Sequence, residues 1–191
     1  MSFFNIMVDL ETLDTRQSAV VTSIGAVAFD PYAVGPFATG DRFYVELTED
    51  LAEQQRRGRT ISADTVLWWM RQGQAAQQLF ASPAPPGVER VDTREALARF
   101  ARFVEANGGS SSEIWGNGAD FDNVILGSLY EDFGIKRPWS YSRNRCFRTM
   151  KNIHGVPHKT ERFGVHHNAL DDAITQVEHL QKINAHLREG K

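Results

Sequence analysis

The sequence has a single cysteine among its 191 residues, Cys146. One cysteine excludes an internal disulfide and a cysteine-rich zinc site, and it is typical of a reducing compartment. The formal net charge is only −3, so the chain lacks the basic excess of a protein that coats nucleic acid. Any polyanionic ligand must therefore meet a local basic patch.

The chain also lacks an apolar run of membrane-spanning length. Its opening residues, MSFFNIMVDLET, have neither the basic start nor the long apolar core of a signal peptide. We therefore expect a cytoplasmic protein without a membrane partner. With 41% hydrophobic and 24% charged side chains, residues 1–191 are expected to form one globular domain around a single core.

Three segments rich in branched and aromatic residues open the chain, at residues 3–10, 20–29 and 42–48. Turn-forming stretches separate them, which predicts three strands joined as a meander. Helical patterns and one further short strand follow: helices at 61–72, 93–109, 122–134 and 168–187, and a strand at 112–118. This order indicates an α/β architecture, in which helices cover a mixed sheet and sites usually lie at strand ends.

The apolar run MVDLETL, residues 7–13, contains two carboxylates one residue apart, Asp9 and Glu11. Alternate side chains of a strand share a face, so these two point the same way while Val8 and Leu10 point toward the core. Neighbouring anions repel unless a divalent cation neutralises them, and hard oxygen ligands suit Mg²⁺ or Mn²⁺. Because D-x-E also occurs at solvated strand ends, further ligands are needed.

A second acidic stretch is WGNGADFDNVIL, residues 115–126. Asp122 is predicted to cap the following helix, with Phe121 placed to pack against Leu126. A helix amino terminus also keeps a carboxylate ionised and ready for a cation. Capping alone would justify the aspartate, so both interpretations stay open, and Asp120, outside the helix, ranks second as a ligand.

The third stretch is GVHHNALDDAITQ, residues 164–176, with two adjacent histidines before the last predicted helix and two adjacent aspartates in its first turn. On the helical wheel Asp171 lies on a solvated strip, whereas Asp172 flanks small alanines that would let the helix approach the sheet closely. Asp172 is therefore the better candidate ligand, although the helix dipole by itself favours an acidic first turn.

These three motifs, in this order, resemble the DEDDh group of 3′ to 5′ exonucleases, whose patterns are D-x-E, then asparagine with two or three residues before F/Y-D, then H-x-A-x-x-D. The matching residues are Asp9 and Glu11, then Asn117, Phe121 and Asp122, then His167, Ala169 and Asp172. Within the group, TVLWWMRQ and NRCFRTMKN look like the branch that contains phage exonuclease A and mycobacterial-type exoribonucleases.

The resemblance implies a ribonuclease H-like fold: a mixed five-stranded sheet, built from a three-stranded antiparallel meander plus parallel strands, flanked by helices. It implies that a nucleic acid with a free 3′ end is hydrolysed to nucleoside 5′-monophosphates. Two Mg²⁺ ions, for which Mn²⁺ can substitute, would be held by Asp9, Glu11, Asp122 and Asp172. His167 would be the general base, because a neutral imidazole accepts a proton at physiological pH.

Six residues are expected to bind substrate: Leu10, Thr12, Asn117, Phe121, Arg148 and Trp68. By resemblance, Leu10 and Thr12 contact the terminal nucleotide. Arg148 belongs to a basic segment, residues 136–162, which contains eight cations and one acid. The segment has a net charge of +7, so the rest of the chain has a net charge of −10. Such a segment would attract phosphates, although charge runs are more often solvated surface. Trp68 is expected to pack against another helix or a second subunit, with stacking on an unpaired base as the alternative that makes it a substrate-binding candidate.

We expect an exonuclease acting on single-stranded DNA or 3′ overhangs. An exoribonuclease that trims RNA ends is the alternative among enzymes, because the resembled branch contains both activities. A catalytically inactive nucleic-acid-binding module is the alternative from another class, and the five intact motif residues argue against it. Relatives often form homodimers, so a homodimer stays open, but nothing in the sequence marks an interface.

Overall fold

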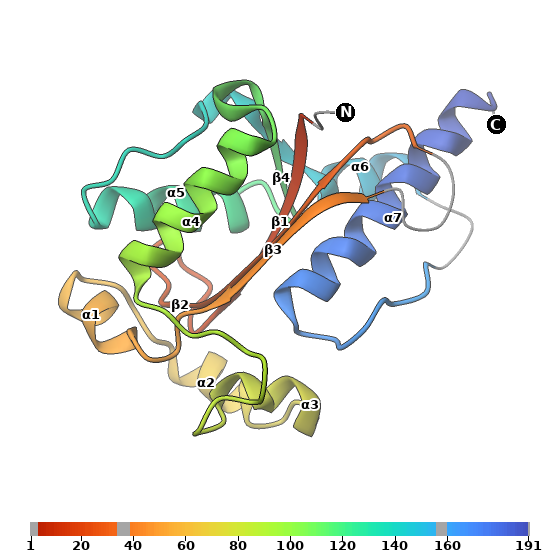
Figure 1. Cartoon of the computed structure of the whole chain (residues 1–191). Helices are drawn as coiled ribbons and strands as arrows, with labels where there is room; N and C mark the ends of the chain where they lie inside the picture. The colour runs from red at the N-terminus through yellow and green to blue at the C-terminus, as the bar shows by residue number, and fades with distance from the viewer. Residues whose placement is uncertain (1–3, 34–38, 156–159, 191) are drawn as a thin grey trace.

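The computed structural model describes residues 4–33, 39–155 and 160–190 of the chain, which are arranged around a five-stranded sheet (Figure 1). The strands are β1 (Asn5–Thr12), β2 (Val21–Phe29), β3 (Thr39–Glu46), β4 (Glu113–Gly116) and β5 (Asn144–Cys146), in the order β3-β2-β1-β4-β5. The first three strands form an antiparallel meander, and β4 pairs in parallel with both β1 and β5. The expected mixed five-stranded sheet is confirmed.

Helices cover both faces of this sheet (Figure 1). Their bounds are α1 (Leu51–Arg56), α2 (Ala63–Trp69), α3 (Gln74–Gln77), α4 (Thr93–Ala106), α5 (Asp122–Asp132), α6 (Phe147–His154) and α7 (Ala169–Arg188). One core lies under α4 and α5, and a second core lies under α6 and α7. The short helices α1, α2 and α3 lie together beyond one end of the sheet (Figure 1).

Strand β1 divides its side chains between the two cores, as its alternating sequence requires. Ile6, Val8 and Leu10 pack with the core under α4 and α5, whereas Met7 packs with the core under α7. Asp9 and Glu11 therefore share the α7 side of the sheet with Met7. Strand β2 is buried along its whole length, so even its two polar residues, Thr22 and Ser23, are shielded from water.

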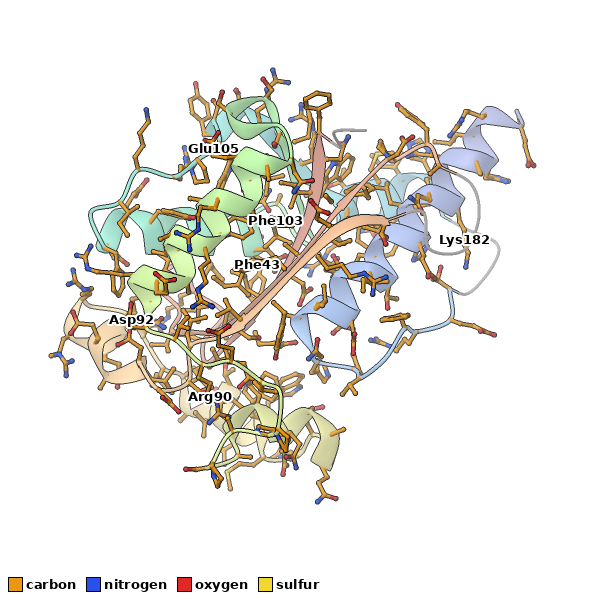
Figure 2. All side chains as sticks on the ribbon, viewed as in Figure 1. Phe43, Arg90, Asp92, Phe103, Glu105 and Lys182 are labelled. Atoms are coloured by element: carbon orange, nitrogen blue, oxygen red, sulfur yellow. The ribbon has the colours of Figure 1, made fainter. Side chains whose placement is uncertain are left out.

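Helix α4 is held on the sheet by a group of aromatic rings. Phe43 of β3 lies against Phe103 of α4 (Figure 2), with ring centroids 5.6 Å apart. It also lies against Phe100 of the same helix, with ring centroids 5.4 Å apart. Edge-on and tilted arrangements of this kind add to the stabilisation that comes from burial alone. Side chains thus fill the space between α4 and the sheet.

Four elements have no counterpart in the sequence interpretation: α1, α3, β5 and α6. Each has eight residues or fewer, which is too short for a periodic pattern to stand out from its surroundings. The helix predicted at 61–72 is also shorter than expected, because α2 ends at Trp69. Among the described residues, no helix combines the length and the apolarity needed to cross a membrane.

Candidate active site

Three carboxylates from two distant segments meet beside β1. Oxygens of Asp9, Glu11 and Asp172 lie within 4.8 Å of one another. The approach of α7 to the sheet depends on Gly25 of β2, where an added Cβ would lie 2.2 Å from the backbone of Ala169. A bare glycine under the first turn of α7 thus allows Asp172 to reach the two acids of β1. We call these three residues the carboxylate cluster.

Asp122 lies next to this cluster but is held differently. It is 1% exposed, and its two oxygens accept hydrogen bonds from the backbone N–H groups of Leu10 (3.1 Å) and Asn117 (2.7 Å). The expectation that Asp122 caps α5 is wrong: Phe121 occupies the N-cap position and Asp122 is the first helical residue. Its carboxylate ties β1 to the loop before α5 instead of satisfying the helix itself.

Burial and mutual repulsion disturb the protonation of these acids. Shielding from water, together with the charges of Asp122 and Glu11, raises the pKa of Asp9 well above its ordinary value. The same two effects, with Asp172 as the main repelling charge, raise the pKa of Glu11 to about 8. Burial raises the pKa of Asp122 to about 6 against its hydrogen bonds. A group of hard oxygen donors that resists its own ionisation fits a divalent cation.

Asp172 is also the anchor of the loop that precedes α7. One of its oxygens accepts a hydrogen bond from the backbone N–H of His167 (3.0 Å), and the other accepts one from the guanidinium of Arg162 (3.0 Å). Asp171 was expected on a solvated strip, but its carboxylate accepts the backbone N–H of Val165 (2.7 Å). Both aspartates of the pair therefore shape this loop, and Asp172 alone belongs to the carboxylate cluster.

His167 is held in place by aromatic neighbours. Its backbone is left-handed, with φ of 65°, and its ring lies edge-on to Trp68 and Trp69, with centroids 4.7 and 5.9 Å away. Trp69 is in turn fixed to β1, because its indole N–H donates to the carbonyl of Thr12 (2.9 Å). Burial, assisted by the adjacent His166, lowers the pKa of His167, which favours the neutral imidazole that accepts a proton.

Gln176 is a site residue that sequence reasoning did not select. It is 7% exposed, and its side-chain N–H donates to an oxygen of Asp9 at 2.6 Å. Its position one turn after Asp172 was the available signal, because residues four apart on a helix share a face. The amide orients Asp9 from the side of α7.

A cleft of about 1310 Å³ surrounds the carboxylate cluster and is lined by residues of β1, α2, α6 and α7. Five of the six residues expected to bind substrate line it: Leu10, Thr12, Asn117, Phe121 and Trp68. Among the residues that the structure describes, Arg148 does not line the cleft, and its side chain is exposed on α6. Leu10 is 4% exposed and belongs to the core, so it reaches the cleft only by its edge.

The basic segment 136–162 does not act as one patch. Lys151 and Arg162 line the cleft. Arg143 and Arg145 instead form ion pairs with Glu113 of β4. The segment also includes Lys159, which lies outside the described residues. Phosphate attraction near the carboxylate cluster therefore falls to a minority of these cations.

The sequence is similar to known nucleases. A family model described as the 3′-5′ exoribonuclease Rv2179c-like domain matches residues 4–184. An exodeoxyribonuclease of Enterobacteria phage T4 is 29% identical over 133 residues, which are 68% of this chain and 56% of the phage protein. The chain thus spans little more than half the length of that relative.

Solved structures show the same fold at low sequence identity. The nuclease domain of 3′hExo, a DEDDh family member bound to rAMP, superposes with a TM-score of 0.58 at 11% identity, covering 99% of this chain and 94% of that one. Escherichia coli exonuclease I in complex with a dA16 oligonucleotide gives a TM-score of 0.58 at 12% identity, covering 97% of this chain and 43% of the other.

Proposed function

Because the chain belongs to the Rv2179c-like 3′-5′ exoribonuclease domain family, within the DEDDh exonucleases, we propose that it hydrolyses nucleic acid from the 3′ end and releases nucleoside 5′-monophosphates. The observation that carries this proposal is the carboxylate cluster, in which Asp9 and Glu11 of β1 and Asp172 of α7 bring their oxygens within 4.8 Å. The placement of His167 beside the cluster adds a proton acceptor to a metal-binding set of acids.

The carboxylate cluster, with Asp122 beside it, would hold two Mg²⁺ or Mn²⁺ ions. When bound, such ions supply positive charge for the attacking water and for the leaving 3′ oxygen. Gln176 keeps Asp9 oriented through its 2.6 Å hydrogen bond. His167 accepts the proton of the attacking water at its ring, and its aromatic neighbours restrict where that ring can lie.

The rest of the cleft would bind the substrate strand. Lys151 and Arg162 offer cations to backbone phosphates. Leu10, Asn117 and Phe121 border the place where a terminal nucleotide would meet the carboxylate cluster. Trp68 is 41% exposed, so part of its ring can also stack on an unpaired base.

We propose single-stranded DNA or a 3′ overhang as the substrate, and RNA as the second candidate. The phage relative is an exodeoxyribonuclease, which favours DNA. The family model is described as an exoribonuclease domain, which favours RNA. A contact to the 2′-hydroxyl group would decide between the two sugars.

The test is product analysis on matched DNA and RNA strands labelled at the 3′ end, with Mg²⁺, with Mn²⁺ and with EDTA. We expect labelled mononucleotides from at least one strand in either metal and none in EDTA, and the ratio of the two initial rates ranks the substrates. A protein that binds single strands but releases no mononucleotide in either metal would instead be an inactive binding module.

A further inference from the structure

Two neighbouring imidazoles and one carboxylate form a second group of potential metal ligands at the rim of the cleft. His166, His167 and Asp172 each offer one ligand atom, and these atoms lie within 4.8 Å of one another. The two rings are stacked, with centroids 3.6 Å apart and an angle of 26° between their planes. We call these three residues the histidine cluster.

The histidine cluster is assembled before any ligand arrives. His167 is packed edge-on against Trp68 and Trp69, and its backbone N–H holds Asp172 at 3.0 Å. The left-handed backbone of His167 places the ring of His166 beside its own. Within the described part of the chain, neither imidazole has a hydrogen bond or ion pair through its ring nitrogens, so these nitrogens are free to bind a cation.

The chemistry of these donors differs from that of the carboxylate cluster. Imidazole nitrogen with one carboxylate oxygen suits Zn²⁺ and related transition ions, whereas Mg²⁺ prefers oxygen ligands throughout. Ligand atoms of a tetrahedral zinc ion lie roughly 3.3 Å apart, given bond lengths near 2.0–2.1 Å. On binding, the observed spread of up to 4.8 Å must close to that distance, and the two stacked rings must turn apart so that their nitrogens point at one ion.

We propose that His166, His167 and Asp172 form a separate site for Zn²⁺ or a similar transition ion, and that occupation of this site inhibits the enzyme. Asp172 belongs to both clusters, so an ion in the histidine cluster withdraws it from the carboxylate cluster. The same ion occupies the ring of His167, which is then unable to accept a proton. The inhibitory half of this inference rests on the proposed nuclease function, whereas the binding half does not.

The binding half is tested without any substrate. Purified wild-type protein, His166→Ala, His166→Asn and Asp9→Asn are titrated with Co²⁺, whose visible absorption is strong in a four-coordinate site and weak in an octahedral one, and bound Co²⁺ is then displaced with Zn²⁺. We expect the two His166 variants to weaken Zn²⁺ binding roughly tenfold or more, the order lost with a metal-site partner. Asp9→Asn removes an acid of the other cluster only and should stay within about twofold of the wild type.

The inhibitory half is tested by adding Zn²⁺ to the nuclease assay at saturating Mg²⁺. With each protein measured against its own rate without zinc, His166→Ala should require roughly tenfold more Zn²⁺ than the wild type for half inhibition. Equal Zn²⁺ affinity in the wild type and both His166 variants would overturn the site, since zinc would then bind at the carboxylates. If the chain released no nucleotide at all, the Co²⁺ titration would still decide the binding half.

Discussion

Replacing Glu11 with glutamine should stabilise the metal-free protein at neutral pH. Burial and the nearby charge of Asp172 raise the pKa of Glu11 from 4.5 to about 8, so the folded state holds this proton more tightly than the unfolded chain does. The stability associated with protonated Glu11 is fully present below pH 4.5 and is lost progressively as the pH rises toward 8. Glutamine resembles the protonated side chain at every pH and escapes this loss.

The magnitude follows from the shift. Each pKa unit corresponds to about 1.4 kcal/mol, and pH 7 lies some 2.5 units above 4.5 but still below 8. The unfolded chain has then ionised Glu11 while the folded state largely keeps the proton, so about 3.4 kcal/mol of stability is lost at pH 7. At pH 5 the same relation leaves less than about 1 kcal/mol. The difference in unfolding free energy between Glu11→Gln and the wild type should therefore shrink about fourfold between pH 7 and pH 5.

The assay is urea unfolding in EDTA at half-unit steps from pH 5 to pH 8, followed by circular dichroism. The matched control is Glu105→Gln, which removes the same charge from an exposed residue of α4 (Figure 2) and should change stability by less than about 0.5 kcal/mol. Saturating Mg²⁺ should abolish the advantage of Glu11→Gln, because a bound cation stabilises the ionised acid. Curves for Glu11→Gln and the wild type that stay parallel across this pH range would refute the reasoning.

Three further predictions concern the supports of the site. In Gly25→Ala the new Cβ would lie 2.2 Å from the backbone of α7, and the forced shift of the helix should lower the nuclease rate roughly 100-fold. The control is Gly73→Ala, whose Cβ meets nothing within 4 Å. Equal rates for the two variants would contradict the close approach of α7 to β2. His167→Ala should lower the nuclease rate roughly 10²- to 10⁴-fold, while Mg²⁺ should still raise the melting temperature of the variant as it does that of the wild type. Loss of this stabilisation by Mg²⁺ would make the histidine a ligand of the catalytic ions. Arg162→Gln removes the cation that pairs with Asp172. It should tighten Mn²⁺ binding, measured by calorimetry, roughly two- to fivefold, which is the range of an exposed ion pair. Unchanged or weaker binding would show that this ion pair does not compete with the metal.

Local periodicity was sufficient for the parts of the fold and site that depend on one element at a time. The period of two along β1 placed Asp9 and Glu11 on one face, and the helical period distinguished Asp172 from Asp171. The three-stranded meander and the long helices were predicted for the same reason, because each repeats its pattern over several turns or residue pairs. The short elements α3 and β5 repeat nothing often enough to be seen.

Tertiary structure decided which of these faces meet. Asp122 accepts its hydrogen bonds from Leu10 and Asn117, partners that no local pattern announces. Trp68 and Gln176 acquire their roles only when α2 and α7 are brought against β1 and the loop before α7. A sequence pattern states which side of an element is buried, but the partner across the interface is set by how all the elements pack together, and the chemistry of this cleft arises at those interfaces.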